Sequence, residues 1–153
     1  MIAKIFSIAN LSPTYVVGGK VLSTDENSDL GDGKYIVVEA DESDGSFIHL
    51  QPDVAVLTNI DDDHLTHFNN IFENLLDSFI LFAENVPFYG YMVINGDDKN
   101  IKKISKRISR PKITFGVTNN CDYQIVSISP KEGKQEFKIC LLYTSDAADD
   151  IGR

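Results

Sequence analysis

Two polar clusters hold most of the residue types in this chain that can do chemistry. The first runs Glu39-Ala-Asp-Glu-Ser-Asp44 and the second Thr58-Asn-Ile-Asp-Asp-Asp-His64, and each directly follows a short apolar run. Two like charges about 4 Å apart repel by about 4 kcal/mol at an effective dielectric near 20, so crowded carboxylates favour a bound cation. Carboxylate oxygens suit Mg²⁺, and one imidazole among them is also compatible with Mn²⁺ or Zn²⁺. A cation site is one interpretation, and helix caps or a solvated loop is the other.

The three histidines receive different interpretations. His64 follows three acids and is the preferred candidate ligand, whereas His49 and His67 are interpreted as structural. A zinc pair of His64 and His67 is conceivable, but no further patterned ligand supports it. A metal-dependent hydrolase that uses Glu39, Asp63 and His64 remains an alternative. The phosphate-binding pattern G-x-x-x-x-G-K-[ST] does not occur in the 153 residues.

The composition narrows the class of protein. The chain has 153 residues and a formal net charge of −9, and residues 25–63 carry twelve acids against one base, Lys34. This acidic balance argues against a nucleic-acid partner. No apolar run reaches the roughly 20 residues that span a bilayer, so no membrane partner is expected. Cys121 and Cys140 form no C-x-x-C pair, which favours a reducing, cytoplasmic setting.

Short apolar runs alternate with segments of helical periodicity. Strands are expected at 13–17, 35–40, 54–60, 91–94 and 112–115, helices at 2–9, 71–84 and 97–109, a hairpin at 123–129 and 135–142, and a loop at 25–32. Asp97 is the expected N-cap of the third helix. This alternation predicts an α/β domain with a mostly parallel sheet flanked by helices. Strands 35–40 and 54–60 are expected to be buried neighbours, so that both polar clusters meet at their carboxyl ends.

The segment from Glu39 to His64 closely resembles the central domain of the Mur ligases. The runs Val86-Pro-Phe-Tyr-Gly90, Asn95-Gly-Asp-Asp98 and Ile113-Thr-Phe-Gly116 match the same family in order and spacing. The resemblance covers residues 1–139 and implies a partial ATP-binding domain of the phosphate-binding-loop type. Within the family it is nearest to the branch that adds L-alanine.

The resemblance also implies an activity. Such enzymes use ATP and Mg²⁺ to join L-alanine to the carboxylate of UDP-N-acetylmuramate through an acyl phosphate, in peptidoglycan synthesis. Glu39 matches the family's Mg²⁺-binding glutamate, and His64 matches a histidine that helps to hold a second Mg²⁺. Thr58 and Asn59 match a Thr-Asn pair that lines the substrate site. A related ligase that recycles murein peptides is the nearest alternative within the family.

Some positions depart from the family pattern. Thr66 stands where members often have Asp, and Phe79 stands where ligases that add later amino acids carry a carbamylated lysine. The phosphate-binding loop is expected just before Met1, so the chain is expected to be a truncated and inactive fragment. Residues 140–153 resemble a translated sequencing adapter and are expected to be non-native.

Overall fold

The computed structural model describes residues 1–21, 25–63, 65–118, 120–131 and 134–141. The chain divides into two compact units, Met1–Asp44 and Gly45–Arg153. Within the described ranges, no helix is both long enough and apolar enough to cross a bilayer.

The first unit is a small sheet with one helix. Its elements are α1 (Ile2–Ile8), β1 (Thr14–Val21), β2 (Glu26–Asp29) and β3 (Ile36–Val38), with strand order β2-β1-β3. The central strand β1 runs antiparallel to β2 and parallel to β3. The rings of Phe6 and Tyr35 meet edge to face with centroids 5.1 Å apart, which joins α1 to the start of β3.

Strand β2 lies inside the segment that was expected to be a loop, so that prediction is wrong. Every residue of β2 is exposed, and its four side chains are polar. Backbone pairing with β1 forms the strand, as in the partners Tyr15 and Asp29. Alternation of apolar and polar residues is the sequence signal that predicts a strand. An all-polar strand held by backbone hydrogen bonds lacks this signal.

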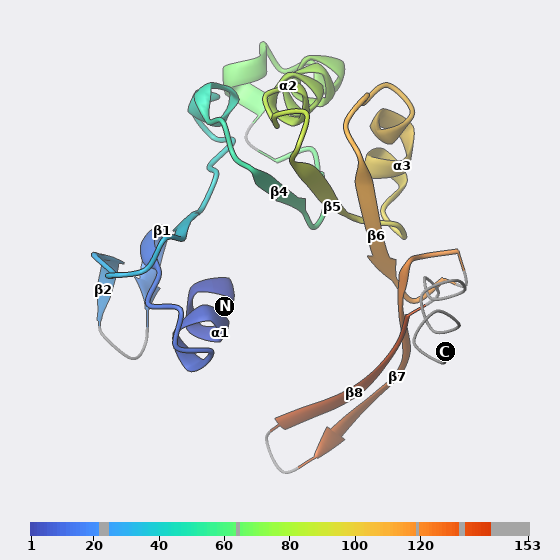
Figure 1. Cartoon of the computed structure of the whole chain (residues 1–153). Coiled ribbons are helices and arrows are strands. Elements are labelled where there is room, and N and C mark those ends of the chain that lie inside the picture. The colour runs from blue at the N-terminus through green and yellow to red at the C-terminus, as the bar shows by residue number, and fades with distance from the viewer. Residues whose placement is uncertain (22–24, 64, 119, 132–133, 142–153) are drawn as a thin grey trace, which may run out of the picture. The chain divides into compact units, whose positions relative to one another are not determined.

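The second unit contains the larger sheet. Its elements are η1 (Ser46–His49), β4 (Val54–Leu57), η2 (Leu65–Phe68), α2 (Phe72–Glu84), β5 (Tyr91–Asn95), α3 (Lys99–Ser105), β6 (Lys112–Gly116), β7 (Tyr123–Lys131) and β8 (Lys134–Leu141). The strand order is β4-β5-β6-β7-β8, parallel from β4 to β7. Strand β8 is antiparallel to β7, and Figure 1 shows this pair extending away from β4–β6 as a long hairpin. The predicted α/β class and hairpin are confirmed.

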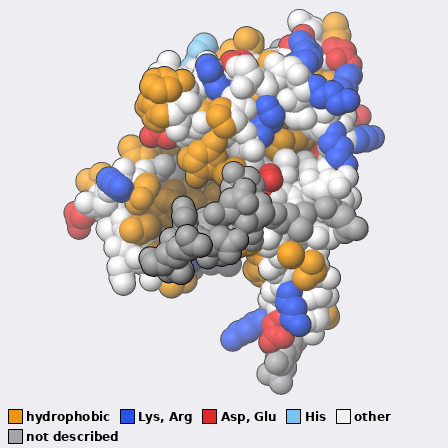
Figure 2. Space-filling model, turned by 45° about the vertical axis from the view of Figure 1, so that its right-hand side comes forward, with side chains coloured by type: hydrophobic (Ala, Val, Ile, Leu, Met, Phe, Trp, Pro, Cys, Tyr) orange, Lys and Arg blue, Asp and Glu red, His pale blue; other side chains and the backbone are white. Residues whose placement is uncertain are grey.

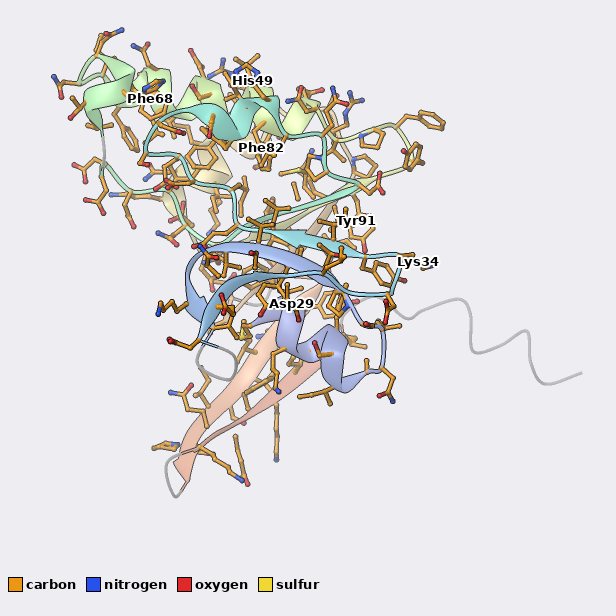
Figure 3. The ribbon with its side chains drawn as sticks, turned by 90° about the vertical axis from the view of Figure 1, so that its left-hand side faces the viewer. Asp29, Lys34, His49, Phe68, Phe82 and Tyr91 are labelled. Carbon is orange, nitrogen blue, oxygen red and sulfur yellow. The ribbon has the colours of Figure 1, made fainter. Side chains whose placement is uncertain are left out.

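Helix α2 supplies much of the core of this unit. Its apolar stripe buries Leu75, Leu76 and Phe82, as the helical spacing predicts. Figure 3 shows Phe68 and Phe82 in the helical layer above the strand that carries Tyr91. Strand β4 buries Ala55 and Leu57 but exposes the alternate residues at 54 and 56, so the expectation of a strand buried on both faces is wrong.

Helix α3 begins later and ends earlier than the periodicity predicts. Asp98, not Asp97, is its N-cap: Oδ1 of Asp98 accepts a 2.7 Å hydrogen bond from the backbone N–H of Ile101. The carboxylate of Asp97 instead accepts from the backbone N–H groups of Val117 and Thr118. Two consecutive aspartates therefore have different structural roles. Residue type alone cannot distinguish these roles, because both residues are aspartates.

Basic residues in α3 and in the segment after it pair with acids of α2. Three bases of residues 103–110 pair with acids of α2: Lys103 with Glu73 at 2.5 Å, Arg107 with Asp77 at 2.8 Å, and Arg110 with Glu84 at 3.7 Å. Figure 2 shows blue Lys and Arg side chains gathered toward one upper part of the molecule. The first two pairs are more than half exposed, so each contributes about 1 kcal/mol or less.

Candidate functional site

Glu39 lies in the first unit, directly after β3. Its backbone N–H donates to the carbonyl oxygen of Val16 at 2.9 Å, which extends the parallel pairing with β1 by one residue. Its side chain then accepts a 2.7 Å hydrogen bond at Oε2 from the backbone N–H of Gly18. The exposed carboxylate is therefore held against β1 by one oxygen.

The acids that follow Glu39 form a turn. The backbone N–H of Ser43 donates to Oδ1 of Asp41 at 2.8 Å, which is the pattern of an Asx turn. This local hydrogen bond gives the carboxylate of Asp41 a structural role in the turn that does not require a bound cation. For Asp41, the interpretation as a loop-forming residue is thus supported.

Thr58 and Asn59 lie at the carboxyl end of β4 in the second unit. Thr58 Oγ1 donates to Asn59 Oδ1 at 3.0 Å, and Asn59 Nδ2 donates to Asp61 Oδ2 at 2.8 Å. The side chain of Asn95, at the end of the neighbouring strand β5, donates to the carbonyl oxygen of Thr58 at 2.9 Å. These contacts hold an exposed polar edge whose hydroxyl and amide groups can contact a polar ligand.

Asn95 and Asp97 lie beside Thr58 and Asn59, although the sequence pattern indicates only a turn at Asn95-Gly96. The backbone N–H of Asp97 donates to Asn95 Oδ1 at 2.9 Å. The hydrogen bonds from Val117 and Thr118 hold the pKa of Asp97 below its usual value. The family match at residues 95–98 was the signal that could have drawn attention to this pair.

The two polar clusters belong to different sheets among the described residues. Strand β3 pairs with β1 in the first unit, whereas β4 pairs with β5 in the second, so the expectation that residues 35–40 and 54–60 form neighbouring strands stays a prediction. A run of apolar residues indicates a strand but carries no information about its partner. Thr58 and Asn59 lie together, Glu39 belongs to the other unit, and His64 lies outside the described residues.

The donor set of Glu39 is compatible with a hard cation. Among the described residues no group of three His, Cys, Asp or Glu side chains is arranged to hold a metal ion. Glu39 does, however, offer a carboxylate whose Oε2 is hydrogen-bonded and whose Oε1 has no partner within the described part of the chain. An exposed carboxylate oxygen is the ligand type that Mg²⁺ takes, together with water and phosphate oxygens.

The other two histidines, His49 and His67, belong to no group of side chains that could hold a metal ion among the described residues. The His67 ring packs on Gly45, where an added Cβ would meet the imidazole, and meets Phe68 edge to face with centroids 5.3 Å apart. His49 is exposed on the outer side of the helical layer (Figure 3). The structural interpretation is supported for His67.

Known proteins are similar to this chain over most of its length. The model of the Mur ligase middle domain matches residues 3–150. A UDP-N-acetylmuramate–L-alanine ligase of Ruthia magnifica subsp. Calyptogena magnifica is 45% identical over 128 residues, which are 84% of this chain and 27% of that protein. The ligase of the same name from Vesicomyosocius okutanii subsp. Calyptogena okutanii (strain HA) is 42% identical over 139 residues, 91% of this chain and 30% of that protein.

A solved structure has the same fold. The crystal structure of a UDP-N-acetylmuramate–alanine ligase from Thermotoga maritima superposes with a TM-score of 0.76 at 23% identity, covering 92% of this chain and 30% of that one. The chain thus spans less than a third of the length of the curated relatives it matches.

Proposed function

The chain belongs to the Mur ligase family, and from that membership we propose that it is part of an ATP-dependent ligase of peptidoglycan synthesis. The proposed reaction joins L-alanine to the carboxylate of UDP-N-acetylmuramate. The observation that carries this proposal is the 45% identity to a ligase of that name over 84% of the chain. The proposed compartment is the cytoplasm, which is supported by the free thiol of Cys121.

The proposed chemistry has two steps. The carboxylate of the sugar nucleotide first takes the γ-phosphoryl group of ATP, which forms an acyl phosphate and ADP. The amine of L-alanine then attacks the acyl carbon, so that an amide forms, inorganic phosphate leaves and the amine loses a proton. When bound, Mg²⁺ neutralises charge on the transferring phosphoryl group.

Residues of this chain have proposed roles in that chemistry. Glu39 is a proposed Mg²⁺ ligand, and the free Oε1 of its carboxylate supports the assignment. Thr58 and Asn59 are proposed to orient substrate, supported by the hydrogen bonds that hold them at the end of β4. His64, the second proposed metal ligand, lies outside the described residues and rests on the family resemblance alone.

Phe79 supports the alanine-adding branch over ligases that add later amino acids. Its ring is 9% exposed and packs against Phe47 with centroids 5.0 Å apart. The position at which those sister ligases carry a carbamylated lysine is therefore part of the hydrophobic core in this chain. A lysine there would have to bury its charge among aromatic rings.

Phosphate release by the full-length protein tests the proposal. With ATP, Mg²⁺ and UDP-N-acetylmuramate, we expect release that depends on L-alanine and is lost in Glu39→Gln. Release that instead depends on a preformed tripeptide identifies the murein-peptide recycling ligase. Metal-dependent hydrolysis of a phosphodiester, abolished by His64→Ala and independent of any amino acid, would replace the proposal with the hydrolase alternative.

A further inference from the structure

The side chain of Glu39 continues the hydrogen-bond ladder between β1 and β3 beyond the last backbone hydrogen bond. The parallel pairing of β1 with β3 reaches Val16 and Val38, and the N–H of Glu39 adds a last bond to the carbonyl oxygen of Val16. The next N–H group of β1 on this side, that of Gly18, donates at 2.7 Å to Glu39 Oε2 rather than to a backbone carbonyl. A carboxylate oxygen has taken the place of a main-chain acceptor.

From this contact we propose that Gly18 is a positioning residue, whose backbone N–H fixes Oε2 of Glu39 and leaves Oε1 as the atom that binds the cation. This inference rests on the proposed role of Glu39 as a Mg²⁺ ligand. A charge-assisted hydrogen bond of this length is among the stronger ones in proteins. Oε2 is partly occupied by this bond, so Oε1 is the more available oxygen for a cation.

Monodentate binding determines which cation the carboxylate suits. Mg²⁺ takes single carboxylate oxygens in octahedral geometry and keeps several waters, whereas Ca²⁺ accepts six to eight oxygens and often takes both atoms of a carboxylate. Binding both oxygens to Ca²⁺ would make the cation compete with the N–H of Gly18 for Oε2. The arrangement therefore favours Mg²⁺ or Mn²⁺ over Ca²⁺.

The geometry around Gly18 supplies a set of matched variants. A Cβ added at Gly18 would lie 3.6 Å from Glu39 Oε2, an ordinary contact, so Gly18→Ala keeps the N–H at little cost. Gly18→Pro removes that N–H. Gly19→Pro places proline at the next position of β1 while the N–H of Gly18 stays, so it controls for the backbone effect of proline next to the site; an added Cβ at Gly19 would meet nothing within 4 Å.

Amide NMR of the ¹⁵N-labelled 153-residue chain tests the contact directly. We expect the Gly18 amide proton to be shifted downfield and to move upfield in Glu39→Ala. During titration with MgCl₂ the signals around residue 39 should shift while the Gly18 proton keeps its downfield position. A Gly18 proton that does not respond to Glu39→Ala, or that loses its downfield shift as Mg²⁺ binds, would overturn the inference.

The variants separate this inference from the proposed function. Loss of an outer partner of a metal ligand typically weakens metal affinity about 10- to 100-fold, and we expect this for Gly18→Pro but not for Gly18→Ala or Gly19→Pro. Equal Mg²⁺ affinity in all three folded variants contradicts a positioning role for Gly18. No response of residue 39 to Mg²⁺ or Mn²⁺ in the wild type instead contradicts Glu39 as a ligand, while the Glu39→Ala comparison still reports on the hydrogen bond. Circular dichroism establishes that each variant is folded.

Discussion

Thr114 and Asp122 exchange three hydrogen bonds across the connection between β6 and β7. Oδ2 of Asp122 accepts from the backbone N–H and from the hydroxyl of Thr114, both at 2.8 Å, and the N–H of Asp122 donates to Thr114 Oγ1 at 2.9 Å. The backbone pairing of these two strands begins only at Phe115 and Tyr123. As at Glu39 and Gly18, an acidic side chain here extends a strand pair past its backbone ladder.

Asp122→Ala should destabilise the second unit. The change removes the acceptor of two hydrogen bonds in a partly buried place, which corresponds to about 1–2 kcal/mol. Urea denaturation monitored by circular dichroism measures the loss. A double-mutant cycle with Thr114→Val provides the control, because the two changes should be far from additive if the contact exists. Full additivity would contradict the contact.

The contribution of Asp122 to stability should depend on pH. The backbone N–H of Thr114 and then its hydroxyl stabilise the ionised form and hold the pKa of Asp122 below its usual value. Its contribution is therefore fully present above the unfolded pKa of about 4 and is lost as the pH falls through the lower folded pKa. Urea curves at several pH values should show the difference between wild type and Asp122→Asn shrinking toward low pH. A difference that grows on acidification would show the opposite sign of shift.

Asp98→Ala should cost about 1 kcal/mol, because it removes the side chain that caps α3. Asp98→Asn and Asp98→Ser keep an oxygen acceptor at the N-cap and should stay close to the wild type. Thermal or urea unfolding of the three variants provides the measurement. If Asp98→Ala were no less stable than Asp98→Asn, the capping role would be refuted.

Gly45→Ala should destabilise the protein by about 1–3 kcal/mol. Gly45 has φ of +71°, a conformation that alanine adopts at a cost, and its added Cβ would meet the imidazole of His67. Gly19→Ala is the matched control, since that position is open. Adding His67→Ala to Gly45→Ala should recover the part of the loss that comes from the collision. No recovery would assign the whole effect to the backbone.

The 153-residue chain should show no MgATP binding in the micromolar range by isothermal titration calorimetry. Its sequence contains no G-x-x-x-x-G-K-[ST] loop, whose backbone N–H groups supply most contacts to nucleotide phosphates. The same titration with the full-length protein serves as the positive control. Clear micromolar binding by the shorter chain would mean that other residues hold the phosphates.

Local sequence patterns were enough to predict most of the helices and strands. The helix at 72–84 follows from apolar residues at helical spacing, and the short apolar runs became β3, β4, β5 and β6. The hairpin of β7 and β8 was also expected, although residues 142–153 of the segment interpreted as non-native lie outside the described residues. Strand β2 was missed because backbone pairing forms it and its polar side chains show no period.

The sequence by itself determined the family, the α/β class and the candidate residues Glu39, Thr58 and Asn59, because residue types and short-range spacing carry that information. Only the tertiary structure decided which strands pair, that Asp98 rather than Asp97 caps α3, and that Asn95 holds the carbonyl of Thr58. It also decided that one oxygen of Glu39 is bound by the N–H of Gly18. Each of these depends on which donor and acceptor groups approach one another in space, and many of these groups are far apart in the sequence, as Thr58 and Asn95 are. Hydrogen bonds are directional and short, so a pattern of residue types cannot specify them.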